Sequence, residues 1–451
     1  MYPFSDQHMD WWIKENEKSF IEDLKKIVSV PSIIGKESQG KPFGEDIDRA
    51  LDEILAISNS LGFRTFKNPE GYYGCAEIGS GAEMIGILGH VDVVPAGELE
   101  VWDTQPFDPM VKDGKVFGRG TQDDKGPTLA SLYAVKLLMD AGVVFNKRIR
   151  FIFGTDEETL WRCMKEYSQR EEMPSMGFTP DSSFPLVFAE KGLLQLTLSA
   201  KNNSGICLKA GTAFNAVPDA AEYKGDLVAE VKQELEQLGY EYQVITDGLK
   251  VLGEPVHAQV AETGKNAIVR LVLAMQAAGI SSKTISFICS EIREDAFAES
   301  IFGICEDVVS GKLKFNIGKI ELAERETLSI DMRIPVTADK EQLVKRLSAS
   351  AEKFGLKYEE YDYLRPIYVP EDHPLIKTLL SVYREVTGDL TSKPISSGGA
   401  TYARAMENCV AFGAVFPGRE KVEHQPNEYI VIKDIQQAIR IYAKSIYQLS
   451  R

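Results

Sequence analysis

Paired cysteine motifs are missing from this sequence. The six cysteines are scattered at positions 75, 163, 207, 289, 305 and 409, and none forms a Cys-x-x-Cys pair with another. Disulfide frameworks and cysteine-based zinc sites both depend on closely spaced cysteines. The pattern therefore favours free thiols in a reducing environment, and we expect a cytoplasmic protein.

Long apolar runs are missing as well. No segment approaches the roughly eighteen apolar residues that a membrane helix needs. The first residues, MYPFSDQHMDWWIKENEKSF, have neither a basic start nor an uninterrupted apolar core, as a signal peptide would have. We therefore expect neither a signal peptide nor a membrane as partner.

Positive charge is scarce relative to negative charge. Lys and Arg number 51 against 67 Asp and Glu, which gives a net charge of −16. Nucleic acids and anionic membranes repel such a chain. A small substrate, with or without a charge of its own, is the partner that this composition favours.

The rest of the composition is typical of a globular protein with sizeable cores. Of the 451 residues, 44% are hydrophobic, 26% are charged and 9% are aromatic. A chain of this length exceeds one ordinary domain, and about two or three domains are expected.

Helical and strand patterns alternate in the first part of the chain. Residues 85–91 and 148–154 have the apolar character of buried strands. Residues 110–117 indicate a hairpin that turns at Asp113–Gly114. We expect helices at 44–62 and from Pro127 to about Ala141, where proline suits the first helical position. This alternation predicts an α/β sheet with helices on its faces.

The middle of the chain has a different character and predicts an inserted domain. From residue 189 to 370, strands alternate with helices expected at about 223–238, 265–279 and 338–354. The pattern suggests two small α/β units of similar order. Amphipathic helices at 374–387 and 434–449 then return to the first domain. We therefore expect a discontinuous domain of residues 1–188 and 371–451, with residues 189–370 as a second domain.

Two short motifs contain candidate metal ligands. In GHVDVVP, His90 and Asp92 are two residues apart at a strand end and point to one face. This could be a metal-binding His with an orienting carboxylate, although a buried structural His–Asp pair is at least as good an interpretation. In GRGTQDDKGP, Asp123 and Asp124 precede a helix, where the dipole favours acids in any case. The glycine spacing there is not that of a P-loop.

The stretch FGTDEETLW places Glu157 and Glu158 side by side after a strand. Side chains of adjacent strand residues leave on opposite sides, so the two acids cannot share one task. A solvated loop explains them simply, and so does a site that needs one carboxylate on a metal and another on a water. Asp181 in FTPDSSFP and His424 in VEHQPNEY complete the set. Two His and four acids at strand ends or loops of one α/β domain match the needs of a two-metal hydrolase.

Taken in order, these motifs resemble those of a known family. The series His-x-Asp, Gly-Arg-Gly-x-x-Asp-x-Lys-Gly, Glu-Glu, Asp and a late His is similar to the aminoacylase/carboxypeptidase family of di-zinc metallopeptidases. GFTPDSSFP, AEKG and HQPNE resemble most its dipeptidase V and Xaa-His dipeptidase (carnosinase-like) branch. The resemblance implies a zinc-exopeptidase-like catalytic domain, a mixed sheet flanked by helices, with an inserted α+β lid made of two similar small units.

The resemblance also implies the role of each ligand. One metal would be held by His90, Asp123 and Asp181, and the other by Asp123, Glu158 and His424, with Asp123 bridging. Zn²⁺ is the expected metal, and Mn²⁺ or Co²⁺ also suit such ligands.

Two further residues receive catalytic roles from the resemblance. Asp92 would orient His90, and Glu157 would be the general base that activates a metal-bridging water. Asp124, which follows the bridging position, is expected to be structural.

In the lid, the resemblance implies a second set of residues that meet the substrate. Asn215 and Arg333 would bind it, the Arg through a terminal carboxylate, and His257 would stabilise the oxyanion. The loop SSGGATYAR (396–404) would contribute Gly399 and Thr401.

The sequence departs from the family pattern in two places. Thr159–Leu160–Trp161 follow Glu158, where smaller residues are usual, which leaves the local loop shape open. Val256 and Ala261 flank His257 where Ala and Pro are usual, which weakens the role given to that histidine.

These features predict a cytoplasmic metallo-dipeptidase that hydrolyses dipeptides, including Xaa-His peptides, with two divalent metal ions per chain. The alternative on the same scaffold is an N-acyl-amino-acid deacylase or desuccinylase. A third class is a binding protein that has kept the fold without catalysis, although all seven expected positions are present. The resemblance implies that a chain with a lid of this length is a monomer with a self-contained site.

Overall fold

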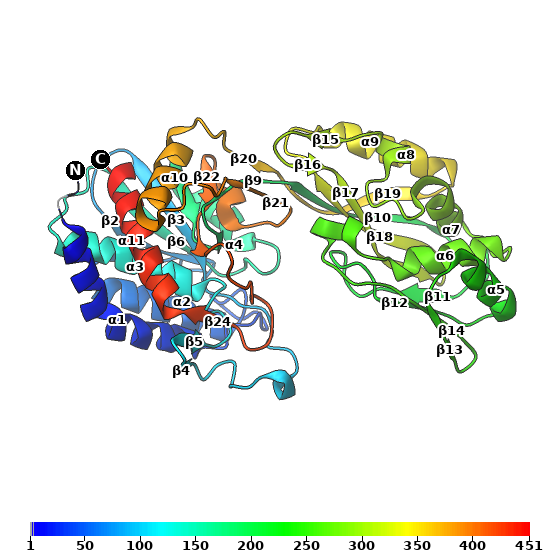
Figure 1. Ribbon diagram of the computed structural model, residues 1–451, viewed down its shortest axis with the longest axis horizontal. Coiled ribbons are helices and arrows are strands. Elements are labelled where there is room, and N and C mark those ends of the chain that lie inside the picture. The colour runs from blue at the N-terminus through cyan, green and yellow to red at the C-terminus, as the bar shows by residue number, and fades with distance from the viewer. Residues whose placement is uncertain (1, 3) are drawn as a thin grey trace. The chain divides into compact units, whose positions relative to one another are not determined.

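The computed structural model describes residues 2 and 4–451 and divides into two compact units (Figure 1). The first contains residues 1–188, 369–395 and 401–451, and the second contains 189–368 and 396–400. The expected boundaries lay at 188/189 and 370/371. The glycine-rich loop at 396–400 groups with the second unit rather than the first.

A mixed sheet forms the centre of the first unit. Its strands follow the order β1-β2-β6-β3-β7-β22. Strand β9 lies next to β22, where Val187 of β9 pairs with Ala411 of β22. The pairs from β6 to β22 are parallel, and β1-β2 and β2-β6 are antiparallel. All seven residues of β3 are buried, as expected for a strand inside a parallel sheet covered on both faces. The strands are β1 (Arg64–Lys67), β2 (Tyr73–Ile78), β3 (Met84–His90), β6 (Arg148–Gly154), β7 (Met176–Thr179) and β22 (Cys409–Ala411).

Helices cover this sheet, and α3 is the most deeply buried of them. It packs against α1, α11 and β3 (Figure 1). It begins at Lys125 rather than at Pro127, so Pro127 lies in the first turn, where its missing N–H needs no partner. The helices are α1 (Asp6–Val28), α2 (Glu45–Ser60), α3 (Lys125–Asp140), α4 (Arg162–Arg170), α10 (Pro374–Thr387) and α11 (Ile432–Leu449), with short 3-10 turns η1 (Leu99–Val101) and η4 (Tyr402–Ala405).

Two small sheets fix loops of the first unit. The predicted hairpin is present, with Asp113 and Gly114 at positive φ as a tight two-residue turn requires. Its second strand pairs with the strand that follows the His424 segment. One sheet contains β4 (Met110–Lys112), β5 (Lys115–Phe117) and β24 (Tyr429–Val431), and the other contains β8 (Ser182–Ser183) and β23 (Ala414–Val415).

The second unit contains an antiparallel five-stranded sheet and a three-stranded sheet. The first has the order β11-β17-β18-β10-β19 and the second β12-β14-β13. Side chains of both sheets and of α5, α6 and α9 belong to one continuous hydrophobic core. The expected division into two similar small units therefore stays a prediction.

The elements of the second unit have the following bounds. The strands are β10 (Gly192–Lys201), β11 (Leu208–Ala210), β12 (Ala220–Tyr223), β13 (Tyr242–Ile245), β14 (Gly248–Leu252), β15 (Glu306–Asp307), β16 (Gly311–Lys312), β17 (Lys314–Leu322), β18 (Arg325–Ile334) and β19 (Lys357–Leu364). The helices are α5 (Val228–Leu238), η2 (Ala258–Thr263), α6 (Ala267–Ala277), α7 (Lys283–Phe287), η3 (Ile288–Ile292), α8 (Glu299–Phe302) and α9 (Lys340–Lys353). The segments that join the units contain β9 (Val187–Glu190), β20 (Ile367–Tyr368) and β21 (Ile395–Ser397).

The mixed α/β content confirms the fold class expected from the sequence. Among the described residues, every helix is too short or too polar to cross a membrane.

Candidate metal centre

Three neighbouring parallel strands bring candidate ligands to one edge of the sheet. His90 is the last residue of β3, which lies between β6 and β7. Glu157 and Glu158 follow β6, and Asp181 follows β7. The carboxyl ends of parallel strands meet at the same sheet edge, which is where open α/β sheets place their sites.

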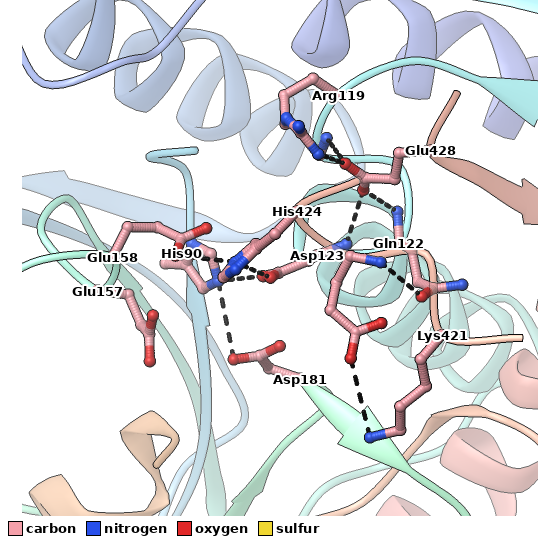
Figure 2. A network of polar contacts seen from close by, with 12 residues as sticks. His90, Arg119, Gln122, Asp123, Glu157, Glu158, Asp181, Lys421, His424 and Glu428 are labelled. Atoms are coloured by element: carbon pink, nitrogen blue, oxygen red, sulfur yellow. Dashed lines mark hydrogen bonds and ion pairs between the residues drawn. The ribbon is translucent and has the colours of Figure 1, made fainter. Parts of the chain in front are cut away.

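Asp123 lies between the two histidines (Figure 2). Its Oδ1 is 2.9 Å from Nε2 of His90, and its Oδ2 is 3.0 Å from Nε2 of His424. One carboxylate thus reaches both imidazoles with a different oxygen. This is the arrangement required of a ligand shared by two metal ions.

The other acids gather around this carboxylate in two groups. Donor atoms of His90, Asp123 and Glu158 all lie within 4.8 Å of one another, and so do those of His90, Glu157 and Asp181. Nε2 of His424 is also 3.1 Å from Oε2 of Glu158. The nitrogen and oxygen donors are those that zinc, manganese and cobalt accept, so the residues present fit a pair of divalent cations.

The electrostatics of the cluster also fit bound cations. Burial, together with the charges of neighbouring acids, raises the pKa of Glu157, Glu158 and Asp181. Like charges packed this closely resist ionisation, and cations would relieve that repulsion.

The pKa values of the histidines are raised too, which favours their charged form, whereas a raised pKa favours the neutral form of an acid. Burial alone would lower the pKa of His424, but its contacts with Asp123 and Glu158 raise it to about 11. The pKa of His90 is also raised well above its usual value despite burial, chiefly by Asp123. Hydrogen bonds from both imidazoles outweigh burial and lower the pKa of Asp123.

Asp92 orients its neighbours in a way that the sequence did not predict. Nδ1 of His90 lies 2.9 Å from the backbone carbonyl oxygen of Asp92 and 3.6 Å from its carboxylate. The carboxylate instead accepts the backbone N–H of Glu158 at 3.0 Å. A backbone carbonyl orients an imidazole as well as a carboxylate does, so Asp92 holds both the His90 ring and the Glu158 segment.

Asp124 contacts α3 and the backbone of β3. Its Oδ2 accepts the hydroxyl of Thr128 at 2.7 Å and the backbone N–H of His90 at 3.3 Å. Burial raises its pKa to about 7. These contacts agree with the structural role expected for it.

The loop after β6 contains an ion pair, and its unusual residues lie between the two partners. The guanidinium of Arg162 donates to both carboxylate oxygens of buried Asp156, at 2.7 and 2.8 Å. The indole of Trp161 donates to the carbonyl of Glu157 at 2.7 Å. Leu160 is 54% exposed, so its size does not disturb the two glutamates.

Two important residues were not singled out from the sequence. Glu428 is fully buried and contacts the segment that contains Asp123, and the side chain of Gln122 contacts the segment before His424 (Figure 2). Gln122 lies in the motif GRGTQDDKGP, and Glu428 lies in the motif HQPNEY. The sequence offered one signal for Glu428, namely an acid inside a motif to which no ligand role had been assigned.

The residues expected to meet the substrate from the lid belong to the second unit. Asn215 is exposed, and its backbone carbonyl accepts the N–H of Ala258 at 2.8 Å. His257 is exposed and precedes η2, where its ring accepts the N–H of Gln259 at 3.2 Å. These contacts establish structural roles for both segments and leave the substrate roles as predictions.

Arg333 is buried and already forms a bidentate pair. Its Nε and Nη2 donate to the carboxylate of Asp331 at 2.6 and 3.1 Å, and its Nη1 donates to the carbonyl of Gly398 at 2.7 Å. The side chain therefore links β18 to the glycine-rich loop within the second unit.

The two loop residues have separate local contacts. The N–H of Gly399 donates to the hydroxyl of Ser397 at 2.9 Å. Thr401 lies in the first unit, where its hydroxyl accepts the N–H of Ala403 at 3.3 Å and caps η4.

Comparisons with known proteins give the chain relatives over nearly its whole length. The profile of "Peptidase family M20/M25/M40" matches residues 86–448. A Bacillus subtilis protein named "Putative dipeptidase YtjP" is 34% identical, with 98% of this chain and 100% of the relative aligned. A Staphylococcus saprophyticus protein named "Putative dipeptidase SSP1012" is 35% identical over 97% of this chain and 98% of its own length.

Solved structures share the fold at low identity. The dipeptidase Dug1p from Saccharomyces cerevisiae superposes with a TM-score of 0.61 at 15% identity, over 98% of both chains. Human carnosine dipeptidase 1 gives 0.60 at 15%, over 98% of this chain and 99% of the other. The Bacillus subtilis YXEP protein, titled a dinuclear metal-binding peptidase, gives 0.51 at 12%, over 97% of this chain and 99% of the other.

Proposed function

The chain belongs to peptidase family M20/M25/M40 and is a peptide-bond hydrolase, and on that premise we propose that it is a dipeptidase dependent on two divalent metal ions. The observation that carries the proposal is the position of Asp123, whose two oxygens each contact a different histidine. The two donor groups that flank it supply further ligands.

The proposed ligands are the two histidines and three of the acids of the cluster, with Glu157 left as the base. His90, Asp123 and Asp181 would hold one ion, and Asp123, Glu158 and His424 the other. When bound, the pair would polarise the scissile carbonyl and lower the pKa of a water. The YXEP protein, which shares the fold, is described as dinuclear. Zn²⁺ is the preferred assignment, with Mn²⁺ or Co²⁺ as alternatives that the donors also accept.

Glu157 is proposed as the general base and acid. Its carboxylate lies in the group with His90 and Asp181, and burial raises its pKa well above that of an exposed glutamate. A base with a raised pKa binds a proton more firmly and can return it to the leaving amine. The chain thus has a carboxylate suited to move one proton from water to nitrogen.

Dipeptides are the proposed substrates, with Xaa-His peptides among them. Curated relatives at 34–35% identity have dipeptidase names, and Dug1p and carnosine dipeptidase 1 are described as dipeptidases. Asn215, His257, Arg333, Gly399 and Thr401 are the proposed substrate-binding residues. We further propose a cytoplasmic monomer, which sedimentation at micromolar concentration tests, because an obligate dimer would contradict it.

A substrate panel tests the proposal directly. The protein is stripped of metal by chelation and reloaded separately with Zn²⁺, Mn²⁺ or Co²⁺. Each form is then assayed with Ala-His, β-Ala-His and other dipeptides, and with N-acetyl and N-succinyl amino acids. We expect turnover of dipeptides that depends on added metal. Hydrolysis confined to the acylated compounds would identify the enzyme as a deacylase or desuccinylase instead.

A further inference from the structure

Two of the three proposed ligands on the His424 side of the centre, Asp123 and His424, lie on separate loops, and each loop is held by a side chain from the other. The Asp123 loop comprises residues 118–124, before α3, and the His424 loop comprises residues 416–428, between β23 and β24. They are about 300 residues apart in the sequence, as the separation of 300 between Gln122 and Val422 indicates.

Glu428, at the end of the His424 loop, reaches into the Asp123 loop. One carboxylate oxygen accepts the N–H of Gly120 at 3.0 Å and the guanidinium of Arg119 at 2.7 Å. The other accepts the N–H of Gln122 at 2.8 Å and of Asp123 at 3.2 Å. The bridging residue is therefore held through its own backbone by an acid of the other loop.

Gln122 makes the reverse connection. Its Oε1 accepts the N–H of Val422 at 2.8 Å and of Glu423 at 3.2 Å (Figure 2). These two amides immediately precede His424 in the chain. Its Nε2 donates to the carbonyls of Glu420 and Tyr429, at 3.4 and 3.5 Å. One carboxamide thus contacts the chain on both sides of the histidine, within the His424 loop and at the first residue of β24.

The two metal ligand sets differ in their need for such support. His90 is the final residue of a buried strand, and Asp181 follows another strand of the same sheet. His424 lies on an irregular loop, its side chain is 52% exposed, and its φ is +62°. A ligand on a loop depends on surrounding hydrogen bonds to keep its orientation, which a ligand at a strand end receives from the sheet.

We propose that Gln122 is a positioning residue that sets the affinity of the His424 side of the centre for metal, by holding the two backbone amides before His424. The inference rests on the proposed two-metal function. Residues that orient metal ligands from outside typically change metal affinity by about ten- to hundredfold when removed. The effect should be confined to one of the two ions. None of the contacts described for the Gln122 side chain reaches the strand ends that position His90 and Asp181.

The test compares Gln122→Met with Gln425→Met. Methionine keeps the length of the side chain and removes its strong donor and acceptor groups. Gln425 is a matched control, because it is exposed in the same loop and, among the described residues, its side chain donates within that loop, to the carbonyl of Lys421 at 3.1 Å. Full-length metal-free proteins are titrated with Co²⁺, followed by absorption spectra, and with Zn²⁺ against a chromophoric chelator.

We expect two sites in the wild type and in Gln425→Met. In Gln122→Met, one site should weaken by about ten- to hundredfold, and the site that remains should have the Co²⁺ spectrum of a His424→Ala variant. Amide exchange at Val422 and Glu423 should accelerate, while the metal-free protein should melt at the wild-type temperature.

Three results would overturn the inference. Unchanged affinity at both sites would show that Gln122 does not position His424. Equal weakening of both sites, or a lower melting temperature of the metal-free variant, would show a general structural role. Fewer than two sites in the wild type would instead overturn the proposed two-metal function on which the inference rests.

Discussion

Glu157 and Glu158 are adjacent in the chain, yet their carboxylates belong to different groups of donor atoms. Glu158 lies with Asp123 and His90, whereas Glu157 lies with Asp181 and His90 (Figure 2). Both lie in the turn that follows β6 rather than in a strand, and the N–H of Glu158 is held by Asp92. Two identical side chains can therefore serve two different tasks.

The first prediction separates these tasks. Glu157→Gln should keep two metal ions per chain and lower kcat by about 10²–10⁴-fold, because the amide cannot take up a proton. The measurements are metal content after gel filtration and turnover of a dipeptide. Glu158→Gln is the matched control and should lose metal from the His424 side. If Glu157→Gln loses metal while Glu158→Gln retains it, the two roles are reversed.

The second prediction concerns the shared carboxylate. Asp123→Ala should lower the occupancy of both metal positions, because Asp123 contacts His90 and His424 with separate oxygens. Asp181→Ala should lower only the occupancy on the His90 side. Elemental analysis of both variants after equilibrium dialysis measures this. Retention of one full ion in Asp123→Ala would contradict a bridging role.

The third prediction is a dependence of metal binding on pH. In metal-free protein the pKa of His424 is raised to about 11 and that of His90 is raised well above its usual value, so both imidazoles hold a proton more firmly than a free histidine does. A metal binds the neutral form, so binding must displace these protons. Affinity should therefore rise as pH increases and fall as pH decreases.

Calorimetry in buffers of different ionisation enthalpy measures the protons released. Proton release is expected at pH 7 from the two histidines and from Glu158 and Asp181, whose pKa burial raises. A His424→Gln variant should release about one proton fewer. Binding enthalpies that do not change with the buffer would contradict the predicted protonation of both imidazoles.

Part of the candidate centre could be predicted because His90, the two glutamates and Asp181 lie at or just after the ends of parallel strands. Apolar runs predicted β3 and β6, and adjacent parallel strands place His90 and the two glutamates at one edge. Amphipathic spacing likewise predicted α10 with its observed bounds. These features depend on local patterns and on a general property of sheets.

Contacts between distant segments could not be predicted in this way. Asp92 orients His90 through a backbone carbonyl, which no side-chain motif can indicate. Gln122 and Glu428 act across about 300 residues of sequence, and their partners are mainly backbone amides. Backbone groups carry no residue signature, so only the folded chain identifies such pairs.

The last prediction tests what Arg333 does in the second unit. Its guanidinium is paired with buried Asp331 and also holds the carbonyl of Gly398. Arg333→Met should destabilise the protein by about 3–5 kcal/mol, because it leaves a buried carboxylate without a partner. Urea unfolding measures the loss. A fall in activity of this variant alone would therefore not identify a substrate contact.

Combining Arg333→Met with Asp331→Asn removes that ambiguity. The double variant has no buried charge at this pair, so most of the lost stability should return. The carboxamide oxygen introduced by Asp331→Asn can still accept the side chain of Gln195, which donates to Asp331 at 3.2 Å. If Arg333 binds the substrate carboxylate, KM for dipeptides should stay raised in the double variant although its stability is restored. The expected rise is about tenfold or more, because a charge-assisted hydrogen bond is worth roughly 1.5–3 kcal/mol. A wild-type KM in the stable double variant would show that Arg333 only supports the glycine-rich loop.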